Sequence, residues 1–221
     1  MKKNILVVDD SALMRKVICD IINSESKFQA KDVCRDGVEA YEKLKTTQYD
    51  GVVLDVNMPR MGGLELLEKL QQDKIKANVI MVSTLTTKDA EITMLAMERG
   101  AIDFVTKPTN IIEAKGIDFR NRLIGVLEAV YQTRTLTRRS LEETRFESTP
   151  VKIVVPVKAP SGRGNKLVAL ACSTGGPKAL QSVIPYLPKN MNAPMVLVQH
   201  MPQGFTKSMA DRLNEISPIR V

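Results

Sequence analysis

Two side chains in the C-terminal part of the sequence could act together as a nucleophile and a base. Ser173 follows an apolar, strand-like run, and His200, the single histidine of the chain, follows the next such run. Because neighbouring parallel strands end at the same edge of a sheet, the hydroxyl and the imidazole could meet there. A histidine within reach of a serine hydroxyl can accept its proton and make it a nucleophile toward an ester or amide carbonyl. The pattern indicates a hydrolase dyad.

The surroundings of Ser173 leave other interpretations open. Gly175 and Gly176 allow a tight turn whose backbone N–H groups could stabilise an oxyanion. The serine could equally cap the helix that follows, or the glycines could bind a phosphate. His200 taken alone could be an ordinary packed or solvated side chain.

A third catalytic group that would orient His200 is not evident. Only Asp211 and Glu215 are acidic after the histidine. Apolar residues recur at helical spacing from Phe205 to Ile216, and both acids fall on the opposite side of that helix. We therefore expect them in solvent, and we expect the triad acid to be absent from the chain.

A second group of side chains could bind a cation and a phosphoryl group. Asp9 and Asp10 follow the first apolar run, Asp55 follows the third, and Lys107 follows the fifth. Each alone could be a helix cap, a turn residue or a surface cation, but strand ends 1, 3 and 5 of an open parallel sheet converge on one crevice. Adjacent carboxylates repel one another unless a cation lies among them, and ligation by oxygen favours Mg²⁺. One carboxylate could then accept a phosphoryl group, whose oxygens the lysine ammonium would bind.

The elements that would position these groups alternate regularly over the first 130 residues. Apolar runs predict parallel strands near 5–8, 28–34, 51–54, 78–82 and 101–105. Apolar residues three or four positions apart predict helices near 11–24, 36–45, 63–73, 88–98 and 111–131. This order predicts an α/β fold with a five-stranded, doubly wound parallel sheet, and we place the first domain at residues 1–125.

The pattern changes in the second part of the chain. Residues 126–166 read as the end of a helix and a basic linker with proline and glycine. Residues 167–221 give a second, Rossmann-like α/β pattern, with buried strands at 167–172 and 195–199, helices at 177–186 and 205–216, and the start of a strand at 218–221. Two strands and a fragment cannot close a doubly wound sheet, so we expect this domain to be incomplete.

The composition argues against several classes of protein. The net charge of +7 lies mostly after residue 130, without the recognition helix or interleaved aromatics of a nucleic-acid interface. No apolar run is long enough to span a bilayer, and the first residues lack the longer apolar region that a signal peptide needs. The three cysteines form no close pair, which is typical of reduced thiols. We expect a cytoplasmic protein that neither binds nucleic acid nor inserts into a membrane.

Residues 1–125 are similar to a response-regulator receiver domain. The matching segments are Val8-Asp9-Asp10-Ser11, Leu54-Asp55-Val56-Asn57-Met58-Pro59, Val82-Ser83 and Phe104-Val105-Thr106-Lys107-Pro108. The resemblance implies that Asp55 is the phosphoacceptor. The implied Mg²⁺ ligands are Asp9, Asp10, Asp55 and the backbone carbonyl of Asn57.

The receiver resemblance also assigns the groups that respond to phosphorylation. It implies that Ser83 and Lys107 contact the phosphoryl group and that Phe104 is the aromatic switch position. Met61-Gly62-Gly63-Leu64 departs from the usual Met-Asp-Gly-Leu, but removes no implied metal ligand.

Residues 167–217 resemble the start of the catalytic domain of chemotaxis protein-glutamate methylesterases. The segments that carry the resemblance are Ser173-Thr174-Gly175-Gly176-Pro177, Gln199-His200-Met201-Pro202 and Gly204-Phe205-Thr206. It implies hydrolysis of methyl-glutamate esters on chemoreceptor helices, and deamidation of some glutamines, with Ser173 as nucleophile and His200 as base. A chemotaxis histidine kinase would be the phosphodonor, and the unphosphorylated receiver would pack over the active site.

Two functions remain for a chain of this kind. The first is a phosphorylation-controlled methylesterase whose activity is impaired, because the sequence ends within its catalytic domain. The alternative is a receiver-only phosphoacceptor, a phosphate sink or docking module with a vestigial hydrolase tail.

Overall fold

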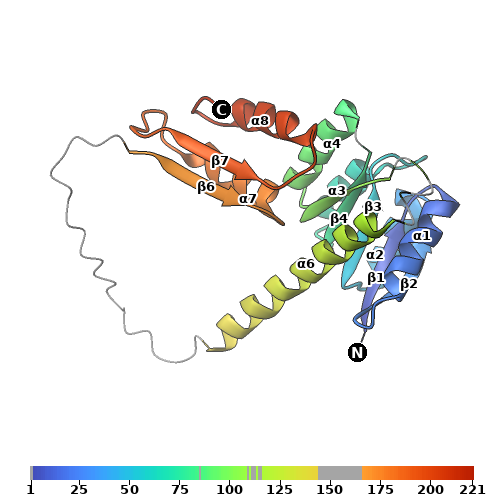
Figure 1. Cartoon of the computed structure of the whole chain (residues 1–221). Helices are drawn as coiled ribbons and strands as arrows, with labels where there is room; N and C mark the ends of the chain where they lie inside the picture. Colours follow the sequence, from blue (N-terminus) through green and yellow to red (C-terminus); the bar gives the residue numbers. More distant parts are fainter. Residues whose placement is uncertain (1, 85, 109, 111–112, 114–115, 144–165) are drawn as a thin grey trace.

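The computed structural model describes residues 2–84, 86–108, 110, 113, 116–143 and 166–221, without the side chains of 131–143. These residues form two α/β units (Figure 1). The first contains β1 (Lys3–Val8), α1 (Ala12–Asn23), β2 (Phe28–Cys34), α2 (Gly37–Thr46), β3 (Gly51–Asp55), α3 (Gly63–Gln72), β4 (Val79–Ser83), α4 (Thr87–Glu98), β5 (Asp103–Thr106) and α6 (Ile117–Glu143). The second contains β6 (Val168–Cys172), α7 (Gly176–Val183), the 3₁₀ turn η1 (Ile184–Tyr186), β7 (Met195–Gln199) and α8 (Phe205–Ile216).

The first unit has the predicted fold. Its five strands are all parallel and lie in the order β2-β1-β3-β4-β5. Every residue of β3 and β4 is buried, because helices cover both faces of the sheet. Side chains of α1 and α6 pack on one face, and those of α2, α3 and α4 pack on the other. The order reverses beside β1, which leaves a crevice at the carboxyl ends of β1 and β3.

Polar side chains fix where the helices near that crevice begin. The Ser11 hydroxyl accepts the Met14 N–H at the start of α1, and Thr86 accepts the Asp89 N–H at the start of α4. Asp36 caps α2 by accepting two backbone N–H groups. These caps satisfy donors that the first helical turn leaves without partners, so each loop ends at a defined residue.

The second unit is a two-stranded parallel sheet with helices on one face. Leu170 and Leu197 point toward α7 and α8 and join the apolar core there. The opposite face exposes Val196 and Val198, which are 51% and 61% accessible, and Val168 at the start of β6 is 40% accessible. The prediction that these strands are buried was wrong. An apolar run indicates burial on both faces only where a second layer is present, and the described residues supply one layer.

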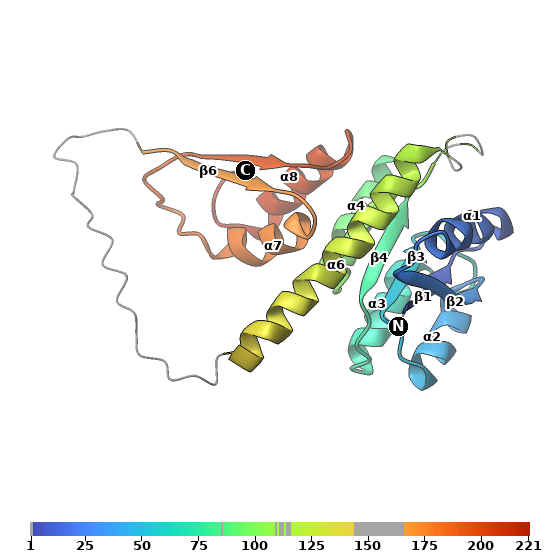
Figure 2. The same cartoon turned by 60° about the horizontal axis from the view of Figure 1, so that its bottom comes forward.

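Three further boundaries differ from those predicted. Helix α6 extends to Glu143, beyond the predicted end near residue 131 and well beyond the sheet (Figure 2). Residues 132–143 lack apolar helical spacing, which is why the sequence pattern missed them. The predicted helix 177–186 divides into α7 and η1, and residues 218–221 form no strand.

Helix α8 lies against α4 and joins the two units. Phe205, Met209 and Leu213 of α8 are buried, as their helical spacing predicts, and belong to the same apolar cluster as Met94 and Met97 of α4. The core on this side of the five-stranded sheet therefore continues into the second unit.

Gly63, the first residue of α3, should not tolerate a side chain. An added Cβ would overlap the backbone carbonyl oxygen of Asp55 and lie 2.9 Å from Met81 Cε. We expect Gly63→Ala to lower the free energy of unfolding of the receiver by about 2–3 kcal/mol, measured in urea, because backbone must move.

Gly125 of α6 is the matched control, since a Cβ there meets nothing within 4 Å. Gly125→Ala should stabilise the protein by about 0.5–1 kcal/mol through helix propensity. Equal stability of the two variants would contradict the close approach of α3 to the end of β3.

Candidate functional site

Three carboxylates meet at the carboxyl ends of β1 and β3. One oxygen each from Asp9, Asp10 and Asp55 lies within 4.8 Å of the others. Asp9 and Asp55 are buried, whereas Asp10 is exposed. The structure therefore brings together the acidic residues that the strand ends suggested.

Lys107 closes this acidic cluster from the end of β5. Its Nζ donates a hydrogen bond to Asp55 Oδ2 at 2.7 Å and lies 2.9 Å from Asp9 Oδ2. Burial and the charge of Asp9 raise the pKa of Asp55 to about 6, although Lys107 opposes the shift. Burial disfavours the Lys107 ammonium, but the hydrogen bond and charge of Asp55 outweigh it and raise the lysine pKa. The single positive charge of Lys107 therefore does not balance the negative charges of the carboxylates around it.

The acidic cluster has the chemistry of a cation site. Asp9 Oδ1 accepts the Ser11 N–H, whereas the buried Oδ2 accepts no hydrogen bond of suitable geometry despite the nearby ammonium. A buried carboxylate oxygen with unused acceptor capacity, beside two further carboxylates, suits a hard divalent cation. The Asn57 side chain donates to Asp89, so a ligand from Asn57 would be its backbone carbonyl.

Ser83, at the end of β4, is turned toward α4. Its hydroxyl is fully buried, accepts a hydrogen bond from Thr93 at 2.8 Å and lies 3.4 Å from the Asp89 carbonyl oxygen. Phe104 of β5 is also buried, and its ring stacks on Phe205 of α8 with centroids 4.6 Å apart. Ser83, at the end of β4, thus contacts α4, and Phe104 of β5 contacts α8.

Ser173 and His200 meet at the ends of β6 and β7. The strands pair in parallel register up to Cys172 and Gln199, and the His200 N–H donates to the Cys172 carbonyl. This register places Ser173 Oγ 3.5 Å from His200 Nδ1. Both side chains lie in the exposed part of the strand ends, so the pair is accessible and loosely held.

Gln199 holds the two strand ends together, a role that the sequence analysis did not identify. Its Nε2 donates to the carbonyl oxygens of Ser173 and His200, each at 3.0 Å. A Cβ on Gly176 would overlap the Gln199 side-chain oxygen, so the glycine allows this close approach. The one available signal was a polar residue at the end of an apolar strand.

His200 has no carboxylate partner among the residues that the structure describes. Asp211 is paired with Lys207 and Glu215 with Arg212, with both acids mostly exposed, as expected from the sequence. In Ser-His-Asp triads Nε2 faces the serine and Nδ1 faces the acid. Here Nδ1 faces Ser173, so the ring would turn over to adopt the triad arrangement.

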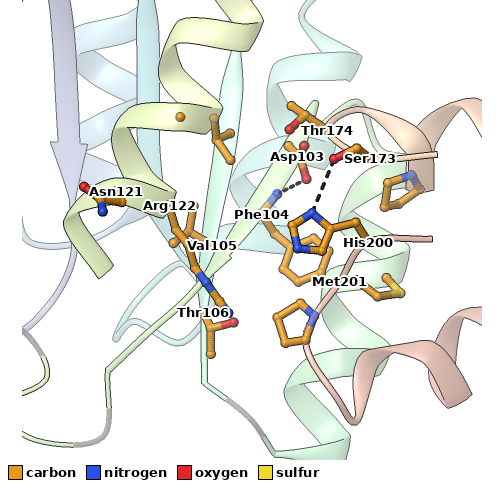
Figure 3. A pocket seen from close by; sticks show the side chains of 14 residues that line it. Asp103, Phe104, Val105, Thr106, Asn121, Arg122, Ser173, Thr174, His200 and Met201 are labelled. Atoms are coloured by element: carbon orange, nitrogen blue, oxygen red, sulfur yellow. Dashed lines mark hydrogen bonds between the residues drawn. The ribbon is translucent and has the colours of Figure 1, made fainter. Parts of the chain in front are cut away.

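The serine and histidine line a pocket of about 400 Å³ whose other walls come from the receiver (Figure 3). Strand β5 contributes its residues 103–106, and α6 contributes Arg122, Val126 and their neighbours. The walls from the second unit are Ser173, Thr174, Pro177 and the segment 200–202. The dyad therefore faces the receiver across a shared pocket.

Polar contacts also join the two units. Arg212 of α8 binds both carboxylate oxygens of Glu98 at 2.5 and 2.8 Å. Lys178 donates to the Gly100 carbonyl at the end of α4, and Gln181 donates to the Met94 carbonyl. The Gly175 N–H donates to Asp103 Oδ2 at 2.7 Å. The sequence analysis did not single out Asp103, an isolated acid within an apolar run.

Comparisons with known proteins agree with both units. The family model for the response regulator receiver domain matches residues 5–115, and the model for CheB methylesterase matches residues 168–221. The receiver domain of Thermotoga maritima CheB superimposes with a TM-score of 0.51 and 39% identity, over 60% of this chain and 96% of that one.

Curated relatives match the whole chain. A protein-glutamate methylesterase/protein-glutamine glutaminase of Pyrococcus abyssi is 43% identical over 100% of this chain and 58% of the relative. The protein of that name from Bacillus subtilis is 42% identical over 98% of this chain and 61% of the relative. The chain thus spans about 60% of the length of these relatives. It belongs to the response-regulator receiver family, with the receiver joined to a CheB methylesterase sequence.

Proposed function

We propose that this protein is a phosphorylation-controlled protein-glutamate methylesterase of the chemotaxis system. Its substrates would be methylated glutamates, and some glutamines, on chemoreceptor helices, and its phosphodonor a chemotaxis histidine kinase. The pocket shared by the dyad and the receiver carries this proposal, because a receiver beside a nucleophile can govern access to it. We assign residues 1–125 to the receiver, 126–166 to a connecting segment and 167–221 to the hydrolase portion.

The receiver chemistry follows from the acidic cluster. Asp55 would accept the phosphoryl group, and the Lys107 ammonium would move from its carboxylate to the phosphoryl oxygens. Asp9, Asp10, Asp55 and the Asn57 carbonyl would hold Mg²⁺, which when bound neutralises the carboxylates and the added phosphoryl charge. Ser83 would leave Thr93 and donate its hydroxyl to the phosphoryl group, with Phe104 responding to the space that it vacates.

The hydrolase chemistry follows from the dyad. His200 would accept the Ser173 proton as Oγ attacks the ester carbonyl, and would then protonate the departing methanol. Water would hydrolyse the acyl-serine, leaving a glutamate carboxylate and restoring the hydroxyl. Backbone N–H groups of the Gly175-Gly176 turn would be placed near the developing oxyanion.

The receiver-only function is the second candidate. The exposed, 3.5 Å contact to Nδ1 and the absence of an acid on His200 within the described ranges favour it. A misoriented histidine reduces serine hydrolase rates by roughly 10⁴-fold. Such a chain would still take up phosphate at Asp55.

Methanol release from methylated chemoreceptor, with and without acetyl phosphate, separates the two functions. The methylesterase proposal predicts release that increases with the phosphodonor, together with acid-stable but hydroxylamine-labile phosphate on the receiver. Asp55→Asn should abolish the labelling and the stimulation, whereas Ser173→Ala should abolish release and leave the labelling unchanged. Normal labelling without release, equal to that of Ser173→Ala, would support the receiver-only function.

The raised pKa of Asp55 predicts a pH-dependent stability in Mg²⁺-free buffer. The carboxyl titrates at about 6 in the folded protein, against roughly 3.9 when unfolded. The folded state therefore retains a proton that the unfolded state has lost, so this contribution is complete below pH ~4 and is lost as the pH rises through ~6. Two pKa units correspond to about 3 kcal/mol.

Urea unfolding in EDTA across this pH range, for the wild type and Asp55→Asn, measures the effect. The variant should be the more stable at neutral pH and should lack the Asp55 part of the slope. Mg²⁺ should reduce the difference between the two proteins. Parallel stability curves for the two proteins would contradict the burial of an uncompensated charge at Asp55.

A further inference from the structure

Asp103 is a buried carboxylate at the boundary between the two units. It is the first residue of β5 and only 6% accessible. Its Oδ1 accepts the N–H of Phe104 at 2.8 Å, and its Oδ2 accepts the N–H of Gly175 at 2.7 Å. The receiver thus supplies one donor to this carboxylate, and the hydrolase portion supplies the other.

Gly175 belongs to the turn that presents Ser173. Its φ of +75° lies in the left-handed region that glycine favours, and it is the cap residue of α7. The N–H groups of such a turn, at a helix N-terminus, attract negative charge. Asp103 also lines the same pocket as Ser173 and His200 (Figure 3). A carboxylate of the receiver therefore accepts a hydrogen bond from a backbone N–H beside the nucleophile.

The contact at Asp103 is specific because the carboxylate has few other partners. No Lys or Arg in the described part of the chain pairs with it. Burial raises the pKa of Asp103, and the N–H groups of Phe104 and Gly175 oppose that shift. Charge-assisted hydrogen bonds from backbone N–H groups are among the stronger hydrogen bonds in proteins. The Gly175 contact therefore helps to hold the two units together, and it also uses the Gly175 N–H that substrate would otherwise find free.

We infer that Asp103 is an inhibitory carboxylate, which binds the nucleophile turn in place of substrate. This inference rests on the proposed methylesterase function. Hydrolysis of a methyl-glutamate ester would leave a carboxylate beside Ser173, and Asp103 presents that chemical group from within the chain. The receiver therefore presents a product-like group to the nucleophile turn.

Strand β5 connects this inhibitory carboxylate to the phosphorylation site. Lys107 follows the strand directly and holds Asp55, and Thr106 is in register with Ser83. Between these ends Phe104 stacks on Phe205. Rearrangement of Ser83 and Lys107 around a phosphoryl group would act on the strand that carries Asp103.

Amide hydrogen exchange by NMR on the full chain tests whether Asp103 accepts a hydrogen bond from the Gly175 N–H. The Gly175 amide should be protected in the wild type and should exchange roughly tenfold faster or more in Asp103→Ala. Asp103→Asn, which keeps an acceptor but loses the charge, should give an intermediate rate. Asp20→Ala, at an exposed acid on α1, should leave the rate unchanged.

The His200 amide, bonded to Cys172 within the hydrolase portion, is the internal reference. It should keep its protection in every variant, which shows that the strands remain paired. Unchanged Gly175 exchange in Asp103→Ala would overturn the inference. Loss of His200 protection in both Asp103 variants would also overturn it, because Asp103 would then be a general structural support.

Labelling of Ser173 by a fluorophosphonate tests inhibition itself, with Ser173→Ala as the blank. Asp103→Ala should be labelled several-fold faster than the wild type. Equal labelling of the two would overturn the inhibitory role while supporting a reactive dyad. Absence of labelling in every variant would instead count against the proposed hydrolase function, and the exchange rates would still decide whether Asp103 occupies Gly175.

Discussion

The repulsion among buried carboxylates at one end of the receiver sheet is the constraint on which the structure depends. Asp9 and Asp55 are almost fully excluded from water, yet the ammonium of Lys107 is their main compensation. Burying such charge is costly, and the raised pKa of Asp55 reports that cost. A site under this tension responds strongly to a cation or a phosphoryl group, since either one changes what Lys107 must neutralise.

Strand β5 contacts both units, so a change at that site would act on both of them. Lys107 at its end contacts the acidic cluster, whereas Asp103 and Phe104 contact the nucleophile turn and α8. The apolar core on the α4 side also continues into α7 and α8. Receiver and hydrolase portion are therefore packed as one body around a shared pocket, and a change in β5 or α4 alters the surface that the second unit uses.

Much of this arrangement could be predicted from the sequence, because parallel strands place their carboxyl ends together. Apolar runs located the receiver strands, and helical spacing gave the buried face of α8 from Phe205 to Leu213. The same patterns suggested that the acidic residues, and separately Ser173 and His200, would meet, as the geometry shows.

The failures have equally physical causes. The strand that carries Val196 and Val198 was expected to be buried, but burial of its outer face depends on a second layer that the local sequence does not report. Asp103 and Gln199 act through contacts between segments distant in sequence, which a polar residue in or after an apolar run does not reveal. The length of α6 was missed because its last turns carry no apolar stripe.

The central claim is that the state of Asp55 governs docking of the receiver on the Ser173–His200 pocket. The distance between two spin labels, one on each unit, tests this claim most directly. The labels would be attached at Glu42→Cys and Tyr186→Cys, which are both exposed positions, after the native cysteines are replaced. One narrow distance distribution is expected without phosphodonor. Beryllofluoride with Mg²⁺ should add a longer, broader population, and Asp55→Asn should prevent it. An identical narrow distribution under all conditions would contradict control of the pocket by the receiver.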